Sequence, residues 1–198
     1  MRFLLVILIP VVAFSYWQHR KGQENEARLG EVASAIAQRS VGVDCPGFWR
    51  KIVEVGGEDG RVHFDVAGRP SDSAELSGGT CDRLEDFSRA ETKPAFDCLV
   101  PDDRRCKREV VEIARSLSTL AHEAFHLAGI RDEAAAECYA TQSVDSVAEK
   151  LGATPAQGKL VGIWAARTSP KTHPAEYHSV ECRPGGALDL EPRTAAWP

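Results

Sequence analysis

Two histidines four residues apart, with a glutamate directly after the first, occur in the segment His122-Glu123-Ala124-Phe125-His126. In an α-helix, residues four apart lie one turn apart on the same face, so both imidazoles can reach one metal ion. Glu123 is rotated by about 100° from His122 around the helix axis, so it lies beside the metal rather than binding it. From there its carboxylate can act as the general base toward a metal-bound water. The pattern predicts a hydrolytic zinc site on a helix.

A catalytic zinc ion takes three protein ligands, so a third ligand must come from elsewhere in the chain. Three carboxylates follow within eleven residues of the second histidine: Asp132, Glu133 and Glu137. In an antiparallel helical hairpin, Glu133 lies nearer His126, and Glu137 lies one turn further along. A metal between the helices can then take Glu133, while Glu137 accepts a hydrogen bond from the back nitrogen of His122. Glu137 as the ligand is the alternative, and Asp132 comes third because N-capping already explains it.

Two helices around a glycine must position these groups. Apolar residues at spacings of three and four predict a helix from about Arg104 to Ala128, which Gly129 ends. Asp132 is a good N-cap for a second helix from Glu133 to about Leu151. The two histidines and the glutamates then face one another across a tight bend.

The spacing after the second histidine is similar to the extended motif of the metzincin peptidases. His126-x-x-Gly129-x-x-Asp132 has an aspartate where that family has a third histidine. Metzincins also need a methionine turn beneath the metal, but Met1 is the only methionine in this chain. The resemblance therefore fails at a required part.

Residues 115–142 resemble the gluzincins, the thermolysin-like zinc peptidases, whose third ligand is a glutamate on a later helix. Glu133-Ala-Ala-Ala-Glu137 matches their ligand pattern, with Glu in place of the terminal Asp. The resemblance implies that Glu133 is the third zinc ligand and that Glu137 orients a zinc histidine. Six residues separate His126 from Glu133, which is far shorter than the insert of that family.

The N-terminal segment 1–17 has one basic residue followed by an apolar run from Phe3 to Trp17. This run is shorter than the about 20 residues of a membrane span and is typical of a secretory signal peptide. Ala13-Phe14-Ser15 supplies a small-x-small cleavage site, and an uncleaved membrane anchor is the alternative. Residues 18–40 are then a polar stalk or a first helix, and residues 41–198 are the zincin-like metallopeptidase domain.

Six cysteines are spread over the domain, without any Cys-x-x-Cys pair: Cys45, Cys81, Cys98, Cys106, Cys138 and Cys182. An even, dispersed set behind an export signal is typical of a disulfide framework, and six buried free thiols in a cytoplasmic protein are the alternative. The sequence cannot choose among the possible pairings, but Cys138 can pin the second helix, and we suggest Cys182 as its partner. We therefore predict an extracytoplasmic protein, secreted or anchored by its N-terminal segment.

The composition is typical of one globular domain, with 198 residues of which 43% are hydrophobic and 27% are charged. A net charge of −5 gives no reason to expect nucleic acid as a partner. Two β-rich runs, residues 48–55 and 61–66, flank a turn and predict a hairpin, whereas residues 68–81 read as a loop. The expected fold is α+β, with a helical hairpin that carries the metal site beside a small β-hairpin or sheet, stabilised by disulfides.

The C-terminal segment 169–198 is rich in proline and glycine, and we expect it to wrap around the domain. Peptidases of this kind often use a histidine or tyrosine donor to stabilise the oxyanion. If the segment folds over the metal, His173, Tyr177 or His178 can supply it, although ordinary surface positions are the simpler interpretation. We expect His63 to be a structural strand residue.

Together these features predict an exported peptidase in which Zn²⁺ is held by His122, His126 and Glu133, and Glu123 activates a metal-bound water for peptide-bond hydrolysis. Its partner is a peptide or protein substrate that the sequence does not identify. The alternative is a non-catalytic, disulfide-stapled envelope module whose His/Glu cluster is a structural metal site or binds no metal.

Overall fold

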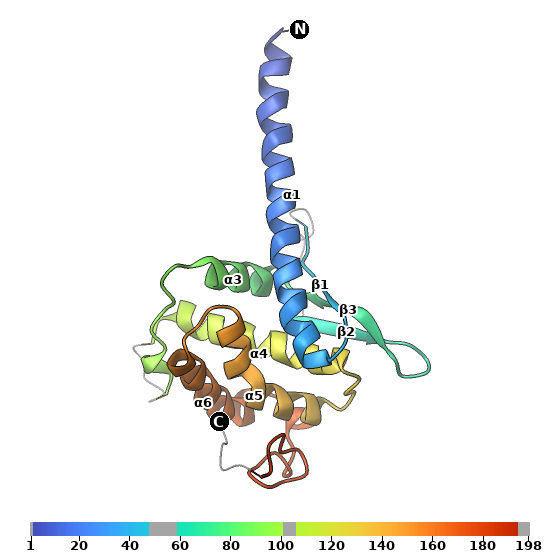
Figure 1. The fold of residues 1–198 in the computed structure, drawn as a ribbon, viewed down its shortest axis with the longest axis vertical. Coiled ribbons are helices and arrows are strands. Elements are labelled where there is room, and N and C mark those ends of the chain that lie inside the picture. The colour runs from blue at the N-terminus through green and yellow to red at the C-terminus, as the bar shows by residue number, and fades with distance from the viewer. Residues whose placement is uncertain (1, 48–58, 101–105, 194–198) are drawn as a thin grey trace.

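The computed structural model describes residues 2–47, 59–100 and 106–193, with only the backbone described for residues 2–19. Its helices are α1 (Arg2–Ala37), α3 (Gly78–Arg89), α4 (Arg108–Leu127), α5 (Glu133–Lys150) and α6 (Pro155–Thr172), with short 3₁₀ turns η1 (Asp97–Leu99) and η2 (Ala175–Tyr177). Its strands are β1 (Gly42–Asp44), β2 (Gly60–Phe64) and β3 (Pro70–Leu76). The predicted α+β class is confirmed (Figure 1).

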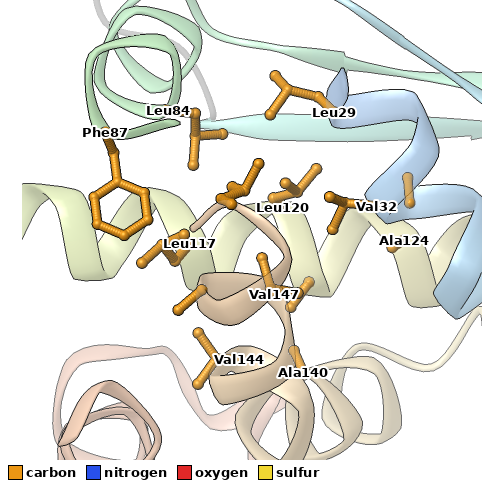
Figure 2. Close-up of a cluster of buried hydrophobic side chains, with 14 of the residues drawn as sticks. Leu29, Val32, Leu84, Phe87, Leu117, Leu120, Ala124, Ala140, Val144 and Val147 are labelled. Atoms are coloured by element: carbon orange, nitrogen blue, oxygen red, sulfur yellow. The ribbon is translucent and has the colours of Figure 1, made fainter. Parts of the chain in front are cut away.

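Helix α4 is the central element, because α1, α3, α5, α6 and the sheet all contact it. Its apolar stripe is fully buried at Leu117, Leu120 and Ala124. Figure 2 shows these side chains between residues of α1, α3 and α5. Each fully buried leucine stabilises the fold by about 1.5–3 kcal/mol. The helix predicted by apolar spacing is therefore confirmed, although it starts at Arg108 rather than near Arg104.

A glycine turn joins α4 to α5, as predicted. Gly129 has a φ of 95°, and its amide donates to the carbonyl of His126 at 2.9 Å. Few residues other than glycine adopt this left-handed conformation without strain. The carboxylate of Asp132 then accepts a hydrogen bond from the amide of Ala135 at 2.8 Å and caps α5. The predicted helical hairpin is confirmed.

The sheet has the strand order β1-β3-β2, with β1 parallel and β2 antiparallel to β3. The loop expected over residues 68–81 is wrong, because this segment contains β3 and the start of α3. Only Ala74 and Leu76 of β3 are buried, so its polar composition hides the alternating pattern of a strand. The β-rich run 48–55 lies outside the described residues, and β2 forms its hairpin with β3 instead.

Helix α1 is continuous from Arg2 to Ala37, and its N-terminal part extends away from the body of the protein (Figure 1). Its C-terminal part packs on α4 and β1 through Leu29, Val32 and Ala33, all of which are buried. This part of residues 18–40 is thus a helix of the core rather than a free stalk. Among the residues that the structure describes, no helix combines the length and apolar content needed to cross a membrane.

Three disulfides pair all six cysteines: Cys45–Cys81, Cys98–Cys106 and Cys138–Cys182. The first ties the segment after β1 to α3, and the second closes the chain before α4. The third joins α5 to the C-terminal segment, which is the partner suggested for Cys138. The expected disulfide framework is confirmed.

Helix α6 packs against α5 and leads into the C-terminal segment. This segment returns along α5, where the side-chain amide of Gln142 donates to the carbonyl of Leu188 and accepts from the amide of Leu190, both at 2.8 Å. Together with Cys138–Cys182, these bonds hold the segment against the domain. It wraps the domain as expected.

Candidate metal centre

The three side chains predicted to bind the metal converge between α4 and α5. Nε2 of His122 lies 2.9 Å from Nε2 of His126, and Oε2 of Glu133 lies 3.1 Å from the first and 3.3 Å from the second. Among the described residues, this is the one group of three or more His, Cys, Asp or Glu side chains close enough to share an ion.

These distances fit a tetrahedral zinc ion. Zinc bonds to imidazole nitrogen and carboxylate oxygen are about 2.0–2.1 Å long, which places neighbouring ligand atoms about 3.3 Å apart. The observed separations of 2.9, 3.1 and 3.3 Å are near that value. A small outward movement of the side chains would complete the match.

The other nitrogen of each imidazole determines which atom faces the centre. Nδ1 of His122 donates to Oε2 of Glu137 at 3.1 Å, and Nδ1 of His126 donates to the carbonyl of Ile130 at 2.7 Å. Each ring therefore carries its proton on Nδ1 and presents the lone pair of Nε2 to the centre. Two imidazole lone pairs and a carboxylate oxygen then face one another, an arrangement that is repulsive without a cation between them.

The same contacts separate the roles of the three candidate carboxylates. Glu133 joins the two histidines, whereas Glu137 faces the opposite nitrogen of His122. Asp132 is engaged as the N-cap of α5. The geometry therefore favours Glu133 as the third ligand and Glu137 as the carboxylate that orients His122.

The protein around this cluster favours positive charge. Burial alone would lower the pKa of His122, but the hydrogen bond to Glu137 and the charges of the neighbouring glutamates outweigh it and raise the pKa. Burial alone would raise the pKa of Glu137, but hydrogen bonds from two histidines and Ser169 hold it well below its usual range. Both shifts indicate a site that stabilises a proton or a metal ion.

Glu123 is buried beside the cluster and faces β2. A Cβ atom added to Gly60 would lie 2.7 Å from Cγ and 2.8 Å from Oε1 of Glu123, so the backbone of β2 closes directly on this carboxylate. Any larger residue at position 60 would force the Glu123 side chain to move. No feature of the sequence indicated this contact, because it depends on how β2 crosses α4.

A cavity of about 880 Å³ contains both the cluster and Glu123. One wall is β2, the floor is α4, and the other wall combines the C-terminal end of α6 with the segment that follows it. The side chain of Glu133 is 39% exposed, whereas those of His122 and His126 are 11% and 8% exposed. The cluster therefore opens into the cavity on the side of Glu133.

Two of the candidate donors reach this cavity. His173 and Tyr177 line it, and the ring centroid of Tyr177 lies 5.7 Å from that of His122. His178 is exposed and is not part of the lining. His63 is an exposed residue of β2 that faces Glu75, in agreement with a strand role.

Sequence reasoning also missed Phe64 of β2, whose ring packs edge-on against His126 with centroids 6.0 Å apart. The guanidinium of Arg131 lies over this ring, 5.6 Å from its centroid. Phe64 thereby adds an aromatic contact to the hydrogen bond that orients His126. An aromatic residue in a short strand carries no signal that could have revealed this role.

Comparison with known proteins finds no relative: no family model, no curated protein and no solved structure matches this chain.

Proposed function

We propose that this protein is a zinc-dependent peptidase. The observation that carries the proposal is the convergence of Nε2 of His122, Nε2 of His126 and Oε2 of Glu133 beside the buried carboxylate of Glu123. Two histidines and one carboxylate form a donor set typical of catalytic zinc, which keeps a fourth position for water or substrate. No fourth His, Cys, Asp or Glu joins the group in the described part of the chain.

Zinc at this centre would supply a Lewis acid that polarises the scissile carbonyl and makes a water more acidic. Glu123 accepts a proton from that water as its oxygen attacks the carbonyl carbon. When the carbon–nitrogen bond breaks, Glu123 returns the proton to the leaving amine.

The three disulfides are compatible with an oxidising, extracytoplasmic compartment.

The length of the cavity supports an extended peptide as the substrate. Its floor runs along α4 from Val111 to His126, a separation of fifteen positions or about 22 Å of helix. An extended chain covers this length with about six or seven residues. Val111 and Trp164 make the far end apolar, so an apolar side chain of the substrate fits there.

A mixture of unrelated peptides of four to twelve residues, incubated with zinc-loaded protein and analysed by mass spectrometry, tests this function. We expect cleavage that favours peptides longer than about six residues. A zinc chelator should stop it, and added zinc should restore it. Cleavage that ignores the chelator would contradict the zinc mechanism. Zinc binding with no cleavage of any peptide would instead favour a non-catalytic module with a structural metal site.

Tyr177 is a candidate for the oxyanion donor, because it lines the cavity and its ring centroid lies 5.7 Å from that of His122. We predict that Tyr177→Phe lowers kcat by about 10²-fold, since it removes a hydroxyl that would donate to the developing oxyanion. KM and zinc affinity should stay within about twofold. Steady-state kinetics on one cleaved peptide measure this effect. Tyr139→Phe, which alters a tyrosine packed on Phe125, is the matched control. Equal kcat values for the two variants would reject this role.

A further inference from the structure

The carboxylate of Glu137 bridges two imidazoles that come from distant parts of the chain. Its Oε2 lies 3.1 Å from Nδ1 of His122 on α4, and its Oε1 lies 3.1 Å from Nδ1 of His173, which directly follows α6. The side chain of Glu137 is only 8% exposed. A carboxylate so deeply buried is costly unless its oxygens have hydrogen-bond partners within the protein.

His173 is well placed to be the partner of Oε1. Its Nδ1 also lies 3.3 Å from the hydroxyl of Ser169, one helical turn earlier at the end of α6. Ser169 itself bonds to Glu137, so the carboxylate receives hydrogen bonds from His122, His173 and Ser169. Of these, only His173 belongs to the segment after α6, so the position of that segment determines whether Oε1 keeps its imidazole partner.

Packing holds His173 in place. The ring of Tyr177 lies against both imidazoles, with centroids 5.4 Å from His173 and 5.7 Å from His122. Five residues further on, Cys182 is bonded to Cys138, the neighbour of Glu137 on α5. The segment from 173 to 182 is therefore attached to α5 at two adjacent positions, once through Glu137 and once through the disulfide.

We propose that His173 is a positioning residue for the metal, which acts through Glu137 on His122. By holding Oε1, it keeps Oε2 directed at Nδ1 of His122. The proton of that ring then stays on Nδ1, and the lone pair of Nε2 stays directed at the metal. The proposal rests on the metal centre proposed above and extends it to the C-terminal segment, which becomes part of the metal site rather than a cover over it.

Zinc affinity, measured by competition with a chromophoric chelator, tests this role without any substrate. We expect His173→Ala to weaken zinc binding by about 10-fold, the lower end of the loss usual when the direct partner of a ligating histidine is removed, because His173 acts through that partner, Glu137. His173→Asn should recover most of the affinity, because its amide can donate to Oε1 from nearly the same position. His178→Ala, an exposed histidine in the same segment, is the control and should bind zinc like the wild type.

A second readout separates positioning from a general loss of structure. In the cobalt-substituted protein, the visible absorption bands report the geometry of the ligands. His173→Ala should change these bands while the near-ultraviolet circular dichroism of the fold stays that of the wild type. If His173→Ala does not fold, the Asn variant is measured instead. Near wild-type zinc affinity in that variant supports the proposal, and a loss of about 10-fold in a folded Asn variant overturns it.

Unchanged zinc affinity and unchanged cobalt bands in His173→Ala would overturn the role of His173. The proposed metal centre would not be affected by this result. If the wild-type protein itself bound no zinc, the metal centre and the role of His173 would fail together. These two results cannot be confused, because the first requires a wild-type protein that binds zinc.

Discussion

The Glu123→Gln variant is expected to lose about 10³-fold in kcat while it binds as much zinc as the wild-type protein. The amide has nearly the same shape as the carboxylate, but it cannot accept the proton of the attacking water. Zinc binding should survive because Glu123 lies outside the group formed by His122, His126 and Glu133. Peptide hydrolysis and zinc content, measured on the same sample, give both halves of this result.

Glu109→Gln is the matched control for this experiment, because Glu109 lies on the same helix and is exposed. It removes an equal charge from α4 away from the cavity, so its activity should equal that of the wild type. Full activity in Glu123→Gln would end the role of Glu123 as the base. Loss of zinc in that variant would mean that the side chain shapes the metal site instead.

Replacing Glu133 and Glu137 one at a time should weaken zinc binding to very different degrees. Glu133→Ala removes a ligand, and we expect it to weaken zinc binding by more than about 100-fold. Glu137→Gln removes the negative charge behind His122 and replaces one of the two acceptor oxygens by an NH2 donor, and we expect about 10–100-fold weaker binding. Competition with a chelator measures both affinities. A greater loss in Glu137→Gln than in Glu133→Ala would identify Glu137 as the third ligand.

Asp132→Ala serves as the control for these two glutamates. It removes the N-cap of α5, which should destabilise the protein by about 1 kcal/mol, but it should leave zinc affinity nearly unchanged. A loss of zinc in this variant as large as that in Glu133→Ala would show that α5 must be capped for the site to form. The effect of Glu133 could then not be assigned to ligation alone.

The part of the site on the helical hairpin could be predicted because local rules determine it. Helical periodicity places His122 and His126 on one face, Gly129 ends the helix, and Asp132 starts the next. These four residues act within one or two turns of their own positions. Once the hairpin forms, Glu133 lies in the first turn of α5 and faces the two histidines at the end of α4.

Helix α6 was missed because its apolar pattern is weak. Glycines at positions 158 and 162 and Pro170 interrupt the sequence, and the buried face consists mainly of small residues. A start signal was present, however. Thr154 and Gln157 form a reciprocal capping box around Pro155, which is a common first residue of a helix. Without α6, the wall of the cavity that carries His173 could not be anticipated.

The positions of His173 and Tyr177 depend on long-range contacts that no local pattern encodes. Their segment is irregular, and the Cys138–Cys182 disulfide and the hydrogen bonds of Gln142 decide where it lies. Disulfide connectivity cannot be deduced from the spacing of six cysteines. The closure of β2 on Glu123 at Gly60 is likewise a property of the assembled fold.

A zinc titration of the purified, chelator-treated and dialysed protein tests the central claim most directly. We predict that each chain binds one equivalent of zinc, because the lone pairs of His122, His126 and Glu133 converge at one point. Absence of tight zinc binding to the folded, disulfide-bonded protein would contradict the metal centre and the peptidase proposal that depends on it.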